Sequence, residues 1–245
     1  MTSPHSRERE LRANLAAVRA RISAACEAAD RSPDQVTLIA ITKTFPAFDV
    51  RLLAGLGVRD IGENRDQEAA PKAAECAGVD PPLRWHFVGQ LQGNKARSVV
   101  RYADVIHSVD RTRLVAVLGA RARAAGRRVT CLVQVDLDPA SARQAAGDAA
   151  RGGAPPDDVP GLADAIAAED GLTLGGVMAV APLGVPPRPA FRELAGVAAV
   201  VRAAHPGAMM ISAGMTGDLE EAIAEGATHV RVGTALLGGR EALVR

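Results

Sequence analysis

Short runs of apolar residues alternate with helical stretches along most of the chain. Residues 36–42 form a continuous apolar and β-branched run, which is typical of a strand buried on both faces. With seven similar runs, the predicted strands lie at about 36–42, 58–61, 85–88, 105–109, 129–137, 174–180, 209–212 and 230–236. Helical stretches between them include 49–56, 111–125, 162–168, 191–204 and 219–224.

One further helix precedes the first strand, because Leu11, Leu15, Val18 and Ile22 recur at helical spacing within residues 7–31. Eight buried strands alternating with helices predict a (β/α)8 TIM barrel, an α/β fold with this helix as an N-terminal addition. Such barrels form single domains of about 200–250 residues, so we expect one domain over residues 1–245. An open doubly wound sheet is the main competitor, but no strand is followed by its G-x-G-x-x-G turn.

Residues 139–160 do not follow this alternation of strands and helices. They are rich in Ala, Gly, Pro and Asp and have no sustained period. We expect a long loop after the fifth strand, at the C-terminal rim of the barrel, where loops carry function.

Composition limits the class of protein. The 29 basic and 28 acidic residues leave a net charge of +1, and only 2% of residues are aromatic, so a nucleic-acid partner is not expected. No apolar run approaches the ~18 residues of a membrane span, and the polar start predicts no signal peptide. Cys26, Cys76 and Cys131 are odd in number and widely spaced, which argues against a disulfide framework or a zinc cluster. We expect a cytoplasmic protein without a metal site.

Lysine is scarce in this chain. Only Lys43, Lys72 and Lys95 occur among the 29 basic residues, so arginine supplies most of the plain positive charge. Lys43 ends the first predicted strand, where a side chain points into the mouth of a barrel. Partial desolvation there would favour a neutral amine able to form a Schiff base, while an ordinary salt bridge at the rim fits the position equally well. The scarcity of lysine favours the chemical role.

The C-terminal quarter has the composition of a phosphate site. A turn of small and hydroxyl residues at 212–217 follows the seventh strand, and Gly233-Thr234 ends the eighth. Backbone N–H groups of such turns, with the N-terminus of a helix at 218–224, can hold phosphate oxygens. Arg231 lies within the eighth strand and needs a partner, either a structural carboxylate, which the sequence slightly favours, or a ligand in the barrel mouth.

Other polar residues follow the second, third and fourth strands. Glu63-Asn64 ends the second strand, His86 lies in the third, and His107 lies in the fourth. A single buried histidine is more often a hydrogen-bonded core residue than a catalyst. The chain contains no H-E-x-x-H, C-x-x-C or G-x-S-x-G pattern, so nothing supports a zinc or serine hydrolase.

Six motifs, in order over about residues 36–240, resemble the YggS/PROSC family of pyridoxal phosphate (PLP) homeostasis proteins. They are Ala40-Ile41-Thr42-Lys43-Thr44, Gly62-Glu63-Asn64-x-x-Gln67-Glu68, Trp85-His86-Phe87-Val88-Gly89-x-Leu91-Gln92-x-Asn94-Lys95, Gly176-Val177-Met178-Ala179, Ser212-x-Gly214-Met215-Thr216-x-Asp218 and Val230-Arg231-Val232-Gly233-Thr234. The resemblance implies the barrel of fold type III PLP proteins, similar to the N-terminal domain of alanine racemase.

The resemblance also implies roles for individual residues. Lys43 matches the lysine that holds PLP as a Schiff base, and Arg231 matches the arginine near the pyridine nitrogen. The other implied cofactor-binding residues are Ser212, Gly233 and Thr234 around the phosphate, Gly214 and Met215 nearby, and Asn64 beside the ring. No catalytic residue is implied.

This chain departs from the family pattern in several places. Arg65, Gln90 and Gly93 stand where relatives often have an aromatic residue, a proline and a serine. Arg151 aligns with a lysine common in the loop after the fifth strand. An arginine cannot form an imine, so any role of that lysine in PLP transfer is in doubt for this chain.

The resulting expectation is a PLP-binding protein that acts in PLP homeostasis or carrying, with little or no catalysis. The resemblance also suggests a monomer, and PLP-dependent apo-enzymes as recipients. One alternative is an amino-acid racemase, which needs a second acid/base on the other face of the cofactor; the only tyrosine, Tyr102, lies in a helical stretch. Another alternative is a PLP-free Schiff-base lyase acting on a phosphorylated substrate.

Overall fold

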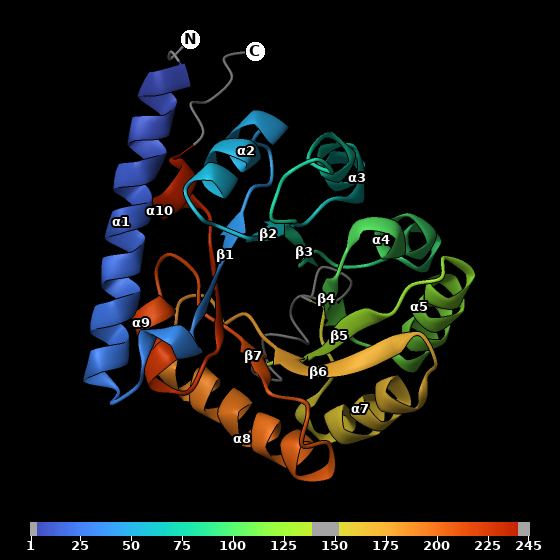
Figure 1. Cartoon of the computed structure of the whole chain (residues 1–245). Coiled ribbons are helices and arrows are strands. Elements are labelled where there is room, and N and C mark those ends of the chain that lie inside the picture. Colours follow the sequence, from blue (N-terminus) through green and yellow to red (C-terminus); the bar gives the residue numbers. More distant parts are fainter. Residues whose placement is uncertain (1–3, 139–151, 240–245) are drawn as a thin grey trace.

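The computed structural model describes residues 4–138 and 152–239. Eight parallel strands form a closed barrel in chain order, with β8 paired to β1 (Figure 1). They are β1 (Thr37–Ile41), β2 (Asp60–Glu63), β3 (Arg84–Phe87), β4 (Val105–Val109), β5 (Val129–Gln134), β6 (Leu172–Met178), β7 (Met210–Ser212) and β8 (His229–Val232). The predicted (β/α)8 barrel is confirmed.

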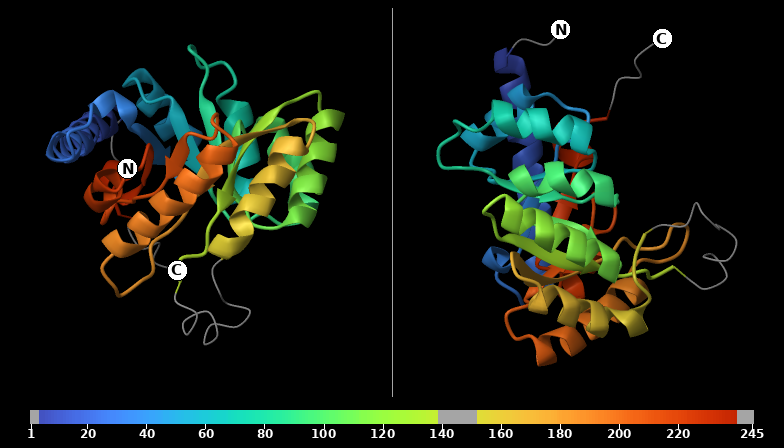
Figure 2. Two further views of the ribbon diagram at one scale, coloured as in Figure 1. Left: turned by 90° about the horizontal axis from the view of Figure 1, so that it is seen from below. Right: turned by 90° about the vertical axis from the view of Figure 1, so that its right-hand side faces the viewer.

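Helices surround the strands on their outer side (Figures 1 and 2). They are α1 (Pro4–Ala28), α2 (Ala47–Gly55), α3 (Asp66–Glu75), α4 (Ala96–Tyr102), α5 (Thr112–Ala124), α7 (Val159–Ala168), α8 (Arg188–Ala204), α9 (Leu219–Ala224) and α10 (Thr234–Leu237). Short 3-10 turns occur at Pro33–Gln35, Gly93–Lys95 and Pro156–Asp158. No helix in the described ranges has the length and hydropathy needed to cross a bilayer.

Several predicted boundaries differ from the structure, including the end of the fifth strand, which lies at Gln134 and not at 137. Two of the differences have a clear physical reason. The eighth strand ends at Val232, and residues predicted to continue it form α10, because a short apolar run serves a strand and a buried helical turn equally well. The predicted loop 139–160 ends earlier than expected, since α7 begins at Val159 and includes Pro160 in its first turn, where proline is tolerated. Residues 139–151 lie outside the described part of the chain.

The N-terminal helix α1 lies alongside α9 and α10 (Figure 1). Its apolar face buries Leu11, Leu15, Val18 and Ile22 in one cluster with residues of α2, α9, α10 and the strands behind them. Arg21 adds an ion pair to Glu220 of α9 at 2.7 Å. The helix therefore covers the outside of the barrel where β8 meets β1.

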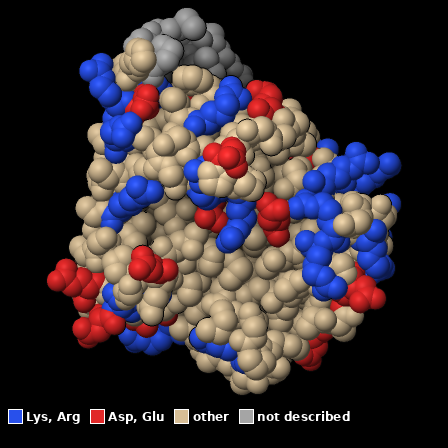
Figure 3. Space-filling view, viewed as in Figure 1, with Lys and Arg blue, Asp and Glu red and all other residues tan. Residues whose placement is uncertain are grey.

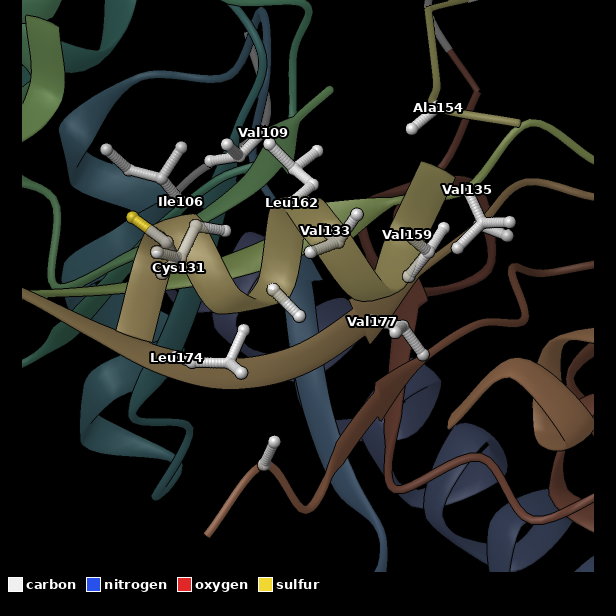
Figure 4. Packing of buried hydrophobic residues seen from close by; sticks show 14 of the residues in the cluster. Ile106, Val109, Cys131, Val133, Val135, Ala154, Val159, Leu162, Leu174 and Val177 are labelled. Carbon is white, nitrogen blue, oxygen red and sulfur yellow. The ribbon is translucent and has the colours of Figure 1, made fainter. Parts of the chain in front are cut away.

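A second apolar cluster fills the space between the strands β3–β7 and the helices α4, α5, α7 and α8. Figure 4 shows part of it, with side chains of β4, β5 and β6 meeting Val159 and Leu162 of α7. The surface carries charges of both signs, and Lys and Arg side chains gather over α4 and α5 (Figure 3). All three cysteines are buried and free.

Candidate functional site

A cavity of about 360 Å³ opens where the strands end. Its lining comes from residues at or just after the ends of β1, β2, β3, β6, β7 and β8, which is where (β/α)8 barrels carry their sites. The lining residues are Ile41, Lys43, Asn64, Val88, Gly89, Met178, Val180, Met215, Thr216, Gly217, Arg231, Gly233 and Thr234. Mostly apolar walls with a few converging polar groups are typical of a small-molecule site.

The cavity brings together most of the residues singled out in the sequence. Lys43, Asn64, Met215, Arg231, Gly233 and Thr234 all line it. Ser212 and Gly214 do not, and Arg151 lies outside the described residues. Thr216 and Gly217 also line the cavity. They were not among the predicted cofactor-binding residues, although both belong to the turn predicted to hold phosphate.

Lys43 lies two residues after the end of β1 and is exposed at the cavity. In the described part of the chain its ammonium takes part in no salt bridge, so the alternative of an ordinary ion pair at the rim finds no partner. The next residue, Thr44, has φ +70°, a left-handed conformation that is unfavourable for a β-branched residue. Strain of this kind persists only where the surroundings hold it in place.

Helix α3 and the end of β2 hold the Lys43 loop. The backbone N–H of Thr44 donates to Glu68 Oε2 at 2.9 Å. On the other side, Thr42 donates its hydroxyl proton to Glu63 Oε1 at 2.6 Å, and Lys72 donates to the Thr42 carbonyl at 2.8 Å. The backbone on both sides of Lys43 is therefore fixed, which explains the polar residues that follow the second strand.

Glu63 and Lys72 form a buried ion pair beneath this loop. Burial raises the pKa of the Glu63 carboxyl, and the hydrogen bonds from Lys72 and Thr42 act against that rise. The second lysine of the chain thus has a structural role, so the scarcity of lysine singles out Lys43 less sharply than expected.

Arg231 forms the floor of the cavity and is 5% exposed. It donates to Ser212 Oγ at 2.7 Å and to the Ala179 carbonyl at 2.8 Å. No carboxylate pairs with it among the described residues, so the favoured structural carboxylate was wrong. Burial lowers the pKa of Arg231 to about 10, which leaves the guanidinium charged at neutral pH. Its remaining N–H groups are available to a ligand.

The turn after β7 forms another part of the cavity wall. Gly214 has φ +88°, and a Cβ there would lie 2.7 Å from Ala222 Cβ, so only glycine allows this turn to pack on α9. The Asp218 carboxylate accepts a hydrogen bond from the Met215 N–H at 2.6 Å and makes no capping hydrogen bond to the helix that follows. This bond fixes the segment that presents Met215, Thr216 and Gly217 to the cavity.

One side chain of the cavity points to a polar ligand. Asn64 lines it, and its buried Oδ1 has no hydrogen-bond partner among the described residues. A Cβ on Gly89 would lie 2.0 Å from the Asn64 carbonyl oxygen, so glycine lets the ends of β2 and β3 approach each other. An amine, a guanidinium and a wall of glycine and threonine residues fit the aldehyde, the ring nitrogen and the phosphate of PLP.

Comparisons with known proteins identify the family of the chain. The family model for the N-terminal domain of alanine racemase matches residues 13–241. The pyridoxal phosphate homeostasis protein of Mycobacterium tuberculosis is 44% identical over 252 residues, covering 96% of this chain and 94% of the relative. PipY of Synechococcus elongatus, solved with PLP bound, has a TM-score of 0.78 at 34% identity and covers 93% of this chain and 100% of its own.

A more distant structure bears on the fold alone. Alanine racemase from Corynebacterium glutamicum has a TM-score of 0.66 at 12% identity, and the match covers 94% of this chain and 63% of the racemase. The barrel is thus the racemase-type barrel that the resemblance implied. With the family model and the close relatives taken together, the chain belongs to the alanine racemase N-terminal domain family and, within it, to the pyridoxal phosphate homeostasis proteins.

Proposed function

We propose that this protein binds PLP in the cavity, holds it as a Schiff base on Lys43 and acts in PLP homeostasis. One observation carries the proposal: the exposed Lys43 amine opens into the same cavity as the buried guanidinium of Arg231 and the glycine- and threonine-rich wall. The names of the close relatives and the PLP in PipY support the same ligand.

The covalent step needs only the lysine amine. Bound PLP supplies an aldehyde and an electron-withdrawing ring. The Lys43 amine would hold the cofactor by adding to its aldehyde carbon, and the two protons of the reacting amine would leave with the carbonyl oxygen as one molecule of water. Water reverses this step, so the cofactor can be released unchanged, as a carrier requires.

The remaining residues would hold the cofactor without reacting. Thr216 and Gly217 after β7, with Gly233 and Thr234 after β8, offer hydroxyl and backbone N–H donors for the phosphate. Thr216 Oγ1 also accepts a weak hydrogen bond from the Ala235 N–H at 3.4 Å, which ties the two loops together. In this proposal Ser212 and Gly214 support the site from behind and do not touch the phosphate.

Little or no catalysis is expected of this arrangement. An arginine at the ring nitrogen does not keep that nitrogen protonated, so the ring withdraws electrons weakly. The hydroxyl of Tyr102, the only tyrosine, is buried in α4 away from the cavity, so it cannot act as the second base of a racemase. PLP-dependent apo-enzymes are the proposed recipients, and the proposed form is a cytoplasmic monomer with one domain.

Absorption spectroscopy of the purified protein tests the proposal. Wild type with added PLP should show a Schiff-base band that borohydride abolishes, and peptide mapping should find the reduced adduct on Lys43. Lys43→Ala should lose the band, while Lys95→Ala, which removes a lysine outside the cavity lining, should keep it.

Two outcomes would change the conclusion. A wild type without a band at saturating PLP would overturn the proposal and favour the lyase alternative. Turnover of an L-amino acid to its D-enantiomer at a rate that Lys43→Ala abolishes would favour the racemase.

A further inference from the structure

The inside of the barrel contains a continuous chain of polar side chains beneath the cavity. From Arg231, hydrogen bonds run to Ser212 Oγ at 2.7 Å, from Ser212 to His107 Nδ1 at 3.0 Å, from His107 Nε2 to His86 Nδ1 at 2.9 Å, and from His86 Nε2 to Asp60 Oδ1 at 2.9 Å. Branched apolar residues usually fill this space in (β/α)8 barrels. We call Asp60, His86, His107 and Ser212 the core relay.

The core relay, together with Arg231, connects two cavities at opposite ends of the barrel. Arg231 forms the floor of the cavity at the C-terminal ends of the strands. Asp60 begins β2 and lines a second cavity of about 390 Å³, between α1 and the first residues of β1 and β2. The three residues between them are almost completely buried, with His86 1% exposed and both His107 and Ser212 fully buried.

The donors and acceptors fix one direction along the core relay. A guanidinium can only donate, so Ser212 Oγ must accept from Arg231, and its own proton goes to His107 Nδ1. His107 then carries its proton on Nε2 and donates to His86 Nδ1, and His86 donates from Nε2 to the Asp60 carboxylate. Every donor along the core relay has an acceptor when both histidine rings are neutral and protonated on Nε2.

No other neutral arrangement satisfies the same contacts. If His107 carried its proton on Nδ1, the Ser212 hydroxyl proton would lose its acceptor. His86 would then have to donate from Nδ1, so its bare Nε2 would face the Asp60 carboxylate. Two acceptors in contact inside a low-dielectric core are strongly unfavourable.

We propose that the core relay is a positioning device for Arg231, which sets its guanidinium for the cofactor and leaves its remaining N–H groups turned to the cavity. The proposal rests on the proposed function, because its benefit appears as affinity for PLP. Without the Ser212 acceptor, the guanidinium would keep only the Ala179 carbonyl among its described partners. It could then adopt other orientations, and part of the binding energy of PLP would be spent on ordering it.

The first test measures the protonated nitrogen of each ring in the cofactor-free protein. Two-bond proton–nitrogen NMR spectra of ¹⁵N-histidine-labelled protein distinguish the two neutral tautomers, and single His→Gln variants assign the five histidines. We expect both His86 and His107 to be neutral with the proton on Nε2. A proton on Nδ1 of either ring would overturn the directed relay, whether or not the protein binds PLP.

The second test measures the dissociation constant of PLP. Ser212→Ala should weaken PLP binding by about tenfold or more, the value of a hydrogen bond to a charged group, and Ser212→Thr should restore most of it. Ser108→Ala is the matched control, because Ser108 is also buried and its hydroxyl has no partner among the described residues. Asp60→Ala, at the far end of the relay, should weaken binding a few-fold, whereas Asp34→Ala beside the same lower cavity should not.

These outcomes separate the two proposals. If wild type binds no PLP, the proposed function fails and the tautomers still decide the relay. If wild type binds PLP and Ser212→Ala binds it equally well, the positioning role is wrong. Melting curves of each variant without PLP identify a loss of affinity that comes only from loss of fold, and in that case Ser212→Thr and Asp60→Ala decide the question.

Discussion

Acid should destabilise this protein through two of the histidines in its barrel. Burial lowers the pKa of His229 from 6.5 to about 4. Complete burial lowers the pKa of His107 well below its ordinary value, and the positive charge of Arg231 acts in the same direction. Both rings therefore stay neutral in the folded protein at a pH where the unfolded chain takes up protons.

The sign and size follow from proton linkage. Below about pH 6.5 the unfolded state binds more protons at these two sites, so the free energy of unfolding falls as the pH falls. Between pH ~7.5 and ~5, a histidine whose pKa drops from 6.5 to about 4 accounts for a loss of about 2 kcal/mol. For His107, the titration of the unfolded chain sets an upper limit of a similar size. The two histidines together account for at most ~4 kcal/mol, which is a large part of a typical stability of about 5–15 kcal/mol.

Two carboxyl groups on the same strand act differently. The raised pKa of Glu63 means that the folded state takes up its proton more readily, so this group offsets part of the loss on acidification. The lowered pKa of Asp60 gives a stabilisation that disappears only as the pH falls through that lowered value, below 3.8 and thus below the tested window. About 4 kcal/mol is therefore the upper end of the expected change.

Urea unfolding followed by circular dichroism at both pH values measures this loss. His229→Gln should reduce the difference in unfolding free energy between the two pH values by about 2 kcal/mol, and so should His107→Gln. His5→Gln, at an exposed position, should leave it unchanged. A wild type that loses less than ~1 kcal/mol, or core variants with the wild-type pH dependence, would refute the reasoning.

Two further predictions concern the support of the cavity. Lys72→Met should lower the free energy of unfolding by about 3–5 kcal/mol, since it leaves the Glu63 carboxylate buried without its partner. Urea unfolding should show that the double variant Lys72→Met with Glu63→Gln recovers much of this loss. A Lys72→Met variant as stable as wild type would contradict the argument. Gly89→Ala should weaken PLP binding about tenfold or more, because its Cβ would collide with the Asn64 carbonyl. Gly93→Ala has open space around its Cβ and should bind PLP normally, and equal affinities for the two variants would contradict the role given to Gly89.

The strands were largely predictable from the sequence because each is a short β-branched or apolar run in a barrel buried on both faces. The same signal failed after Val232, where the apolar residues of α10 pack against α1 rather than extend β8. A buried strand and a short buried helix have the same apolar composition. Only the tertiary contacts distinguish the last turn of a strand from a short buried helix.

Most of the cavity lining was predictable, because side chains at the C-terminal ends of parallel strands gather at one end of the barrel. The depth at which each of these side chains lies was not predictable. Ser212 and Thr216 are both hydroxyl residues of one turn, yet Ser212 lies beneath Arg231 and Thr216 lines the cavity. The partner of Arg231 was missed for the same reason, because nothing in a sequence shows that a hydroxyl and a backbone carbonyl will meet a buried guanidinium.

The contrast between Lys43 and Arg231 bears on whether the site carries PLP or uses it for catalysis. The guanidinium is buried and held by fixed partners, which suits tight and oriented binding. The amine is exposed, so water can reach the bond that it would form with the cofactor. Enzymes usually exclude water from a reactive intermediate, because hydrolysis competes with the reaction. A rigid floor beneath an exposed lysine favours reversible capture and release, and this is the physical reason to expect a carrier.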